Sequence, residues 1–245
     1  MDVVSGPLSA PAILLCFSSD SQVPVPSPLF HATILPVTPY QQNCTLLWCD
    51  ATKKGAIIDP GGEVERLIAA AAQNGVTVEK IFLTHGHLDH ASAAAELKRR
   101  TGARLEGPHE DDRFLLEALG QNRIRPGFEH AEPCTPDRFL GDGDTVTFGA
   151  VTMDVLHCPG HTPGHVVFVQ SEANIAFLGD VLFQGSIGRT DLAGGDGATL
   201  IHSIVEKLWP LGDLGFVPGH GPMSSFAAER RDNPFVSDVA LGRRV

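Results

Sequence analysis

Short apolar stretches that end near glycine or proline recur along the chain from residue 32 onward. Apolar and β-branched residues dominate these stretches, which is the pattern of β-strands. Strands are therefore predicted at residues 32–37, 44–49, 55–59, 78–83, 103–106, 145–148, 151–157, 166–169, 174–178 and 215–217. The segment 78–83 is expected to be buried on both faces of its sheet.

Helical segments lie between these strands. Residues 63–74 start with acidic residues and stop at Gly75, which is typical of a helix. Residues 91–100 are followed by Gly102 in the same way, and two more helices are predicted at residues 111–119 and 199–208. Runs of strands with helices between them predict sheets covered by helices in one mixed α/β domain.

Length and composition suggest how the chain is divided. A chain of 245 residues is long enough for one sizeable domain and short for two. Residues 1–30 are rich in proline and serine, which predicts a disordered or loosely attached extension. The remainder, residues 31–245, is expected to fold as a single domain.

The acidic composition argues against several kinds of partner. With 18 Lys+Arg against 29 Asp+Glu, the chain has a net charge of -11 and lacks the basic surface that nucleic acids or anionic membranes require. No stretch is long and apolar enough to predict a transmembrane helix. The apolar run at residues 11–17 is preceded by one acidic residue, whereas a signal peptide begins with basic residues. Five cysteines without a C-x-x-C pair predict reduced thiols and a cytoplasmic location.

The chain has 11 histidines, an unusual number beside its 18 Lys+Arg, and three of them fall in residues 84–90, Thr-His-Gly-His-Leu-Asp-His. Three imidazoles and a carboxylate buried together need many polar partners, whereas metal ions satisfy all of them. His85 and His87 share one face of an extended chain. Asp89 and His90 lie on the turn into the next helix, so they can face a second ion.

Three further predicted strands are followed by metal-binding groups. His161 follows strand 151–157 in Cys-Pro-Gly-His, Asp180 follows strand 174–178 in Gly-Asp, and His220 follows strand 215–217 in Pro-Gly-His-Gly. Glycine lets the backbone turn tightly where ligands crowd together. Loops at one edge of a rigid sheet are where binding sites usually lie. These positions therefore predict a metal site at the edge of a sheet.

These motifs together resemble those of the metallo-β-lactamase superfamily over residues 33–235. The stretches 158–165, 188–191 and 218–222 are similar to the short bacterial glyoxalase II subgroup, whose members lack the large C-terminal helical domain of longer relatives. The resemblance implies a four-layer αβ/βα sandwich with two divalent ions at one sheet edge. The residues that match the family's ligand set are His85, His87, Asp89, His90, His161, Asp180 and His220.

The resemblance also implies a role for each matched residue. His85, His87 and His161 would bind the first ion. Asp89, His90 and His220 would bind the second ion, and Asp180 would bridge both. Asp89 and Asp180 are the expected catalytic carboxylates.

Other polar residues are expected to support these ligands or to lie apart from them. Asp59 and His165 would orient ligands without binding metal. Arg189 and Asp191 are expected to form a structural ion pair. The histidines expected at the surface, or satisfied in the core, are His31, His109, His130 and His202.

The implied reaction is metal-assisted hydrolysis at an acyl centre. Two divalent ions can hold a hydroxide at neutral pH, because metal binding lowers the pKa of water to ~7. A thioester suits such a site, since its leaving thiolate has a conjugate acid of pKa ~8.5 and requires no strong general acid. We expect S-D-lactoylglutathione or a related acyl-glutathione as the substrate. Zinc is the expected metal, with iron or manganese as alternatives.

Several alternatives remain open. A persulfide dioxygenase of the same superfamily would bind one iron on His85, His161 and Asp180. β-Lactamase activity, a metal-dependent nuclease and a non-enzymatic metal binder are further alternatives, and the Pro-Gly-His-Gly stretch at 218–221 favours the hydrolase. An anionic thioester needs basic groups to receive it, and Lys53, Lys54 and Arg189 are candidates. The substrate contacts and the choice between monomer and dimer stay open.

Overall fold

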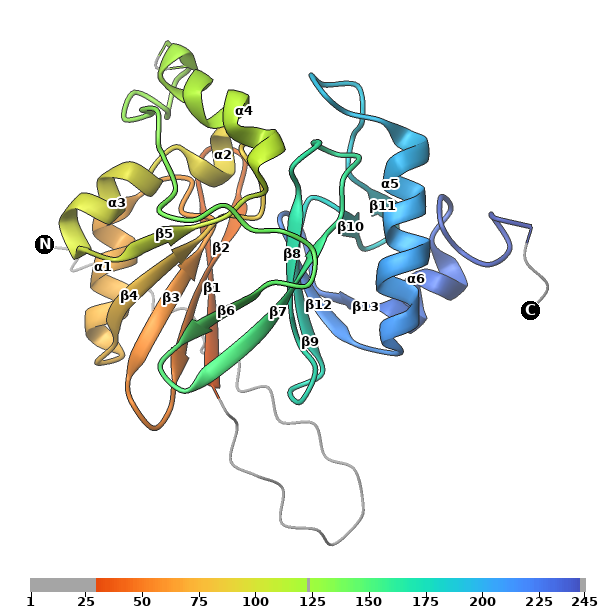
Figure 1. Cartoon of the computed structure of the whole chain (residues 1–245), viewed down its shortest axis with the longest axis horizontal. Helices are drawn as coiled ribbons and strands as arrows, with labels where there is room; N and C mark the ends of the chain where they lie inside the picture. The colour runs from red at the N-terminus through yellow and green to blue at the C-terminus, as the bar shows by residue number, and fades with distance from the viewer. Residues whose placement is uncertain (1–29, 123, 243–245) are drawn as a thin grey trace, which may run out of the picture.

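A computed structural model describes residues 30–122 and 124–242 and contains two large sheets (Figure 1). The first sheet has the order β1-β2-β3-β4-β5, with antiparallel pairing from β1 to β3 and parallel pairing from β3 to β5. Its strands are β1 (Phe30–Val37), β2 (Gln42–Cys49), β3 (Lys54–Ile58), β4 (Thr77–Phe82) and β5 (Arg104–Glu106). The extension predicted at residues 1–30 lies outside the described residues except for Phe30, which begins β1.

The second sheet has the order β13-β12-β9-β8-β7-β6. Its pairs are antiparallel except for β9 and β12, which run parallel. Its strands are β6 (Thr145–Phe148), β7 (Val151–His157), β8 (Val166–Gln170), β9 (Ile175–Gly179), β12 (Gly215–Pro218) and β13 (Ser224–Ser225). A separate small hairpin joins β10 (Leu182–Phe183) to β11 (Ser186–Ile187).

Helices cover the outer face of each sheet (Figure 1). Along the chain, helices lie between or after the strands of the first sheet: α1 (Val64–Gln73), α2 (Leu88–Ala91), α3 (Ala94–Thr101), η1 (Glu110–Asp112), α4 (Arg113–Ala118) and η2 (Leu119–Asn122). The second sheet is accompanied by α5 (Gly197–Ser203), η3 (Ile204–Leu208), η4 (Trp209–Leu211) and α6 (Phe226–Asp232). None of the helices in the described ranges has the length and apolar character needed to cross a membrane.

Three apolar cores hold these layers together. The middle core lies between the sheets and contains Phe82 from the first sheet and Phe168 from the second, with ring centroids 5.4 Å apart. An outer core packs Leu67 of α1 against the first sheet, and another packs Leu200 of α5 against the second. The order helix, sheet, sheet, helix confirms the predicted four-layer αβ/βα sandwich of an α/β protein.

The structure differs from the sequence predictions at several elements. The helix predicted at residues 91–100 is divided into α2 and α3, and the one at 199–208 ends as a π-helix turn. Full burial of the strand at 78–83 was wrong, because Glu79 and Lys80 stay partly exposed and pair with Lys54 and Glu106. The strands β10, β11 and β13 were not predicted, since two-residue strands leave no periodic signal, and the helix α6 was not predicted either.

Candidate metal centre

The predicted ligands come together where four strands from both sheets end. Residues 84–90 follow β4 of the first sheet, whereas the loops with His161, Asp180 and His220 follow β7, β9 and β12 of the second. The backbone joins the sheets here, because Asn43 of β2 donates its N–H to the carbonyl of Gly219 at 2.7 Å. Both sheets therefore present their loops to one common site.

The first group of donors consists of His85, His87 and His161, each with a ring nitrogen within 4.8 Å of the others. Nδ1 of His87 lies 2.9 Å from Nε2 of His161. The His85 side chain is buried, and its Nε2 has no hydrogen-bond partner among the described residues. A metal ion bound between these ring nitrogens would account for their short spacing and would give Nε2 of His85 a partner.

The second group consists of Asp89, His90 and His220, again with donor atoms within 4.8 Å. Nε2 of His220 lies 3.0 Å from Oδ2 of Asp89, and Nε2 of His90 lies 3.7 Å from the same oxygen. Asp89 and His90 both lie on α2, which begins directly after His87. The start of α2 thus divides the motif, with His85 and His87 before the helix and Asp89 and His90 on it.

Asp180 lies between the two groups. Its Oδ2 is 3.5 Å from Nε2 of His161 and 3.8 Å from Nε2 of His220, while its Oδ1 is 3.3 Å from Nε2 of His90. Gly219 makes this position accessible, because a Cβ there would lie 2.1 Å from Oδ1 of Asp180. Only glycine leaves room for the carboxylate between the groups.

Hydrogen bonds at Nδ1 direct three imidazoles toward the centre. Nδ1 of His161 donates to the carbonyl of Arg189 at 2.8 Å, and Nδ1 of His220 donates to the carbonyl of Tyr40 at 3.1 Å. Nδ1 of His90 contacts Oδ2 of Asp59 at 2.9 Å. Because carbonyl and carboxylate oxygens only accept, these contacts place the proton on Nδ1 and leave the Nε2 lone pair for a metal.

Asp59 and His165 support the donors without adding to either group. Asp59 accepts hydrogen bonds from the backbone and the hydroxyl of Thr84 at 2.7 and 2.6 Å, as well as from His90. Asp59 also lies within reach of His85 and His90, but these bonds already occupy its oxygens. His165 stacks on His85 with ring centroids 4.6 Å apart and accepts the N–H of Asp180 at 3.1 Å.

Burial keeps the first group neutral. It lowers the pKa of His85 well below the ordinary value, and together with neighbouring His161 it lowers the pKa of His87 to about 3. Burial also lowers the pKa of His161. Neutral imidazoles have free lone pairs, so these side chains can bind metal at pH 7.

The second group behaves differently because it contains carboxylates. Although burial opposes the charged form, the carboxylates of Asp180 and Asp89 raise the pKa of His90 well above its ordinary value, so a metal ion at Nε2 would displace a proton from that nitrogen. Burial likewise opposes ionisation of Asp180, but His90 and His161 hold its pKa far below the ordinary value. The carboxylates therefore stay ionised and attract positive charge, as an oxygen ligand of a divalent ion must.

The donor set fits two divalent transition-metal ions. Nε2 of His85 is buried and has no hydrogen-bond partner among the described residues, whereas the buried Nε2 of His90 and Oδ1 of Asp180 have only each other, at 3.3 Å. Buried polar atoms without partners are costly unless a ligand satisfies them. Imidazole and carboxylate suit zinc, iron and manganese, so the clusters are consistent with a binuclear site.

Nothing in the sequence pattern marks Asp112 or Asn43 as part of this site. The buried carboxylate of Asp112 accepts hydrogen bonds from N–H groups of Gly86 and Gly164 at 2.8 and 2.6 Å, and from the hydroxyl of Thr162 at 2.8 Å. It thereby ties the loop of His85 to the loop of His161. The Asn43 amide donates to the carbonyls of Pro218 and Gly221 at 3.0 and 2.9 Å, on either side of His220.

The basic residues considered for an anionic substrate are already paired. Arg189 forms two hydrogen bonds with Asp191 at 2.7 and 2.8 Å, which confirms the expected ion pair. Lys53 contacts Asp50 at 2.9 Å and Lys54 contacts Glu79 at 3.2 Å. Lys54 begins β3 and Lys53 directly precedes it, whereas the opposite end of that strand leads to the metal centre.

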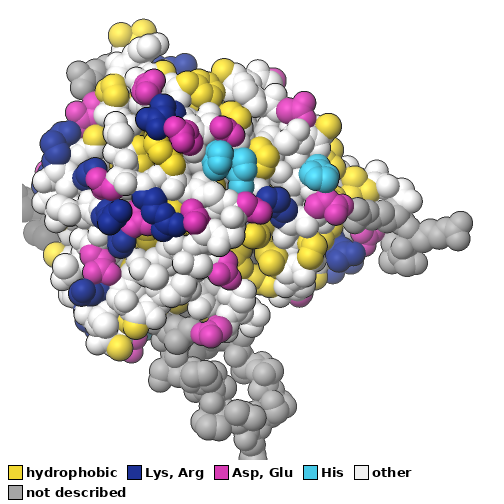
Figure 2. Space-filling model, in the orientation of Figure 1, with side chains coloured by type: hydrophobic (Ala, Val, Ile, Leu, Met, Phe, Trp, Pro, Cys, Tyr) yellow, Lys and Arg dark blue, Asp and Glu magenta, His cyan; other side chains and the backbone are white. Residues whose placement is uncertain are grey.

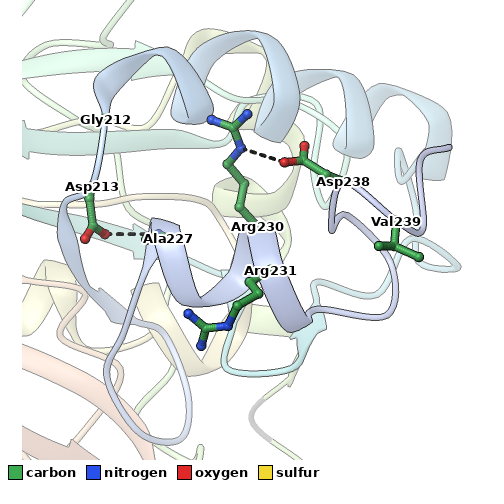
Figure 3. Close-up of a pocket in the computed structure, with 7 residues that line it drawn as sticks. All are labelled: Gly212, Asp213, Ala227, Arg230, Arg231, Asp238 and Val239. Carbon is green, nitrogen blue, oxygen red and sulfur yellow. Dashed lines mark hydrogen bonds and ion pairs between the residues drawn. The ribbon is translucent and has the colours of Figure 1, made fainter. Parts of the chain in front are cut away.

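The hollow in Figure 3 lies apart from this centre. It has a volume of about 430 Å³ and lies beside α6. Its charged side chains already have partners: Arg230 pairs with Asp238 at 3.5 Å, and Asp213 accepts the N–H of Ala227 at 3.0 Å (Figure 3). None of the grouped histidines or carboxylates lines it. The hollow and the His/Asp centre are therefore separate features of the molecule.

Comparisons with known proteins agree with this geometry. A family model for the metallo-beta-lactamase superfamily matches residues 37–220. Hydroxyacylglutathione hydrolase GloC of Haemophilus influenzae is 46% identical over 206 residues, which cover 83% of this chain and 97% of that protein. The crystal structure of the BLEG-1 B3 metallo-beta-lactamase is 36% identical, with a TM-score of 0.75 over 84% of this chain and 99% of that one. The crystal structure of TTHA1623 in a di-iron-bound form is 37% identical, with a TM-score of 0.73 over 82% of this chain and 100% of that one.

Proposed function

This chain belongs to the metallo-beta-lactamase superfamily, and from that premise we propose that it hydrolyses glutathione thioesters. The proposed substrate is S-D-lactoylglutathione or a related acyl-glutathione. The observation that carries the proposal is the complete donor set, in which Asp180 lies between two groups of three donors. The similarity to a hydroxyacylglutathione hydrolase over 83% of the chain supports this choice of substrate.

The metal site would hold two divalent ions, with zinc proposed first and iron as the main alternative. The similarity to a protein solved in a di-iron-bound form supports considering iron. When bound, such ions lower the pKa of water and polarise an acyl carbonyl. The histidines and Asp180 would fix the positions of both ions, because their rings are held by the hydrogen bonds at Nδ1.

The chain's own carboxylates would handle water and charge. Asp89 is only partly buried, so a carboxylate oxygen that is not bound to metal could accept a hydrogen bond from the attacking water. Water adds to the acyl carbon, the C–S bond breaks, and the leaving thiolate takes up a proton to give free glutathione and a hydroxy acid. The thiol has a pKa of ~8.5, so its departure requires no acidic side chain. We also propose a cytoplasmic location, because glutathione is the thiol buffer of the cytosol.

The test is thiol release by the purified, metal-loaded protein from S-D-lactoylglutathione. We expect release in the wild type and its loss in Asp180→Asn, which removes the charge between the two groups. Metal analysis of the same samples separates a binuclear site from a single iron. No release by a protein with two ions per chain would refute the thioesterase, and oxygen uptake on glutathione persulfide with one iron would favour the dioxygenase.

β-Lactamase activity is the second candidate. The similarity to the B3 metallo-beta-lactamase BLEG-1, at 36% identity and a TM-score of 0.75, favours it. Hydrolysis of a β-lactam and of a thioester both begin when water attacks an acyl carbon, so the same metal ligands can support either reaction. Comparing kcat/KM for a β-lactam and for S-D-lactoylglutathione on one preparation decides between them.

A further inference from the structure

We propose that His109, Asp111 and His157 form a second, surface site for one divalent transition-metal ion, apart from the metal centre. His109 directly precedes η1, which contains Asp111, and His157 ends β7. One donor atom from each residue lies within 4.8 Å of the other two. On the face shown in Figure 2, histidine side chains gather with acidic side chains beside them.

The two imidazoles are held together as a pair. Their rings stack with centroids 4.2 Å apart and an angle of 15° between planes. Nε2 of His157 contacts the carbonyl of Pro163 at 2.8 Å. Because a carbonyl only accepts, Nε2 carries the proton and Nδ1 keeps a free lone pair. Burial and the neighbouring His109 lower the pKa of His157, so its imidazole is neutral and ready to bind at pH 7.

His109 and Asp111 place a nitrogen and a carboxylate oxygen at the spacing of two ligands of one ion. Nδ1 of His109 lies 3.3 Å from Oδ2 of Asp111 and accepts the N–H of the same residue at 3.2 Å. A metal ion between this nitrogen and the carboxylate oxygen would take the Nδ1 lone pair, so it would replace the weak 3.2 Å contact with the N–H of Asp111. Two ligands of tetrahedral zinc, with bonds of ~2.0–2.1 Å, lie roughly 3.4 Å apart, which matches this spacing.

The charged residues near Asp111 pair with other groups, so its carboxylate is available to bind a metal ion. Asp142 accepts the N–H of His157 and the ammonium of Lys207, each at 2.8 Å, and Glu110 pairs with Arg113. Within the described part of the chain, neither lysine nor arginine forms an ion pair with Asp111, whose side chain is 57% exposed. Two imidazoles and one carboxylate are the donors that zinc, nickel, copper or cobalt prefers, with water completing the coordination.

An ion at this site would connect two segments that support the metal centre. The N–H of His109 donates to the carbonyl of Gly164 at 3.0 Å, and His157 contacts Pro163 in the same loop. That loop carries His161. We therefore expect the additional ion to raise the thermal stability of the protein, since a ligand that binds only the folded state stabilises it.

Equilibrium dialysis against excess Zn²⁺ tests the proposal on protein whose metal centre is already loaded with zinc. Zinc per chain is measured in the wild type, His109→Gln, Asp111→Asn and His157→Gln. The matched control is His202→Gln, which replaces an exposed histidine on α5. We expect the wild type and the control to bind one more ion per chain than the three site variants, and to gain thermal stability on adding Zn²⁺.

Equal zinc uptake by all five proteins would mean an adventitious ion only and would overturn the proposal. So would the absence of additional zinc in the wild type. Asp111→Asn keeps the test decisive if a histidine variant folds poorly, because Asp111 is exposed and packs against no core. Retention of the two ions of the metal centre shows that each variant is folded. This outcome is independent of whether the protein cleaves a thioester.

Discussion

Replacing Gly219 by alanine should displace Asp180 from between the two donor groups. The added Cβ would lie 2.1 Å from Oδ1 of Asp180, 2.7 Å from Cε1 of His90 and 3.1 Å from the backbone carbon of Gly179. Carbon and oxygen atoms in contact need about 3.4 Å, so the carboxylate must move by about 1.3 Å. A misplacement of about 1 Å in a catalytic site can lower the rate roughly 10²-fold.

Gly215→Ala is the matched control. Gly215 begins β12, the strand that Gly219 directly follows, and the nearest atom to its Cβ would be 3.7 Å away, which is ordinary van der Waals contact. Gly219→Ala should lose metal and about 10²-fold in thiol release, while Gly215→Ala should keep both. The melting temperature checks for general damage, since overpacking costs about 1–3 kcal/mol in stability. Two tightly held ions and near-wild-type activity in Gly219→Ala would refute the geometric argument.

Three further predictions concern residues around the centre. Burial raises the pKa of Asp112 to about 6, so the folded protein retains a proton that the unfolded chain releases near pH 4. That contribution to stability is present below pH 4 and is lost as the pH rises through 6. In urea unfolding of the metal-free protein, the wild type should therefore lose roughly 3 kcal/mol of unfolding free energy over this range, and Asp112→Asn should not. The same dependence of the unfolding free energy on pH in both proteins would contradict this prediction. Asn43→Ala removes the two hydrogen bonds beside His220, so a chelator should extract one ion roughly tenfold more readily; extraction at the wild-type rate would count against a positioning role. Removing both ions with a chelator should lower the melting temperature, because buried metal ligands such as His85 then lose their partner, and it should abolish activity. Adding zinc should restore both. A melting temperature that a chelator does not change would speak against a buried metal.

The metal centre is predictable from the sequence because its donors share a local signal. His85, His87, Asp89 and His90 lie within six residues after an apolar strand, and the other loops carry glycine beside the donor. Asp112 and Asn43 have no such signal, since their roles depend on backbone groups that only the fold brings near them. The same holds for the surface cluster, whose histidines are far apart in sequence, and of which His109 was expected to lie at the surface or to be satisfied in the core.

The distribution of donors over the two sheets explains why the local motif needs the whole sandwich. Each group takes two donors from the segment after β4 in the first sheet and one from the second sheet: His161 after β7 or His220 after β12. Asp180, after β9, also comes from the second sheet. The donors therefore converge only when the middle core around Phe82 and Phe168 has brought the sheets together. Because each ion would then link the two sheets, metal affinity and sheet packing should strengthen one another.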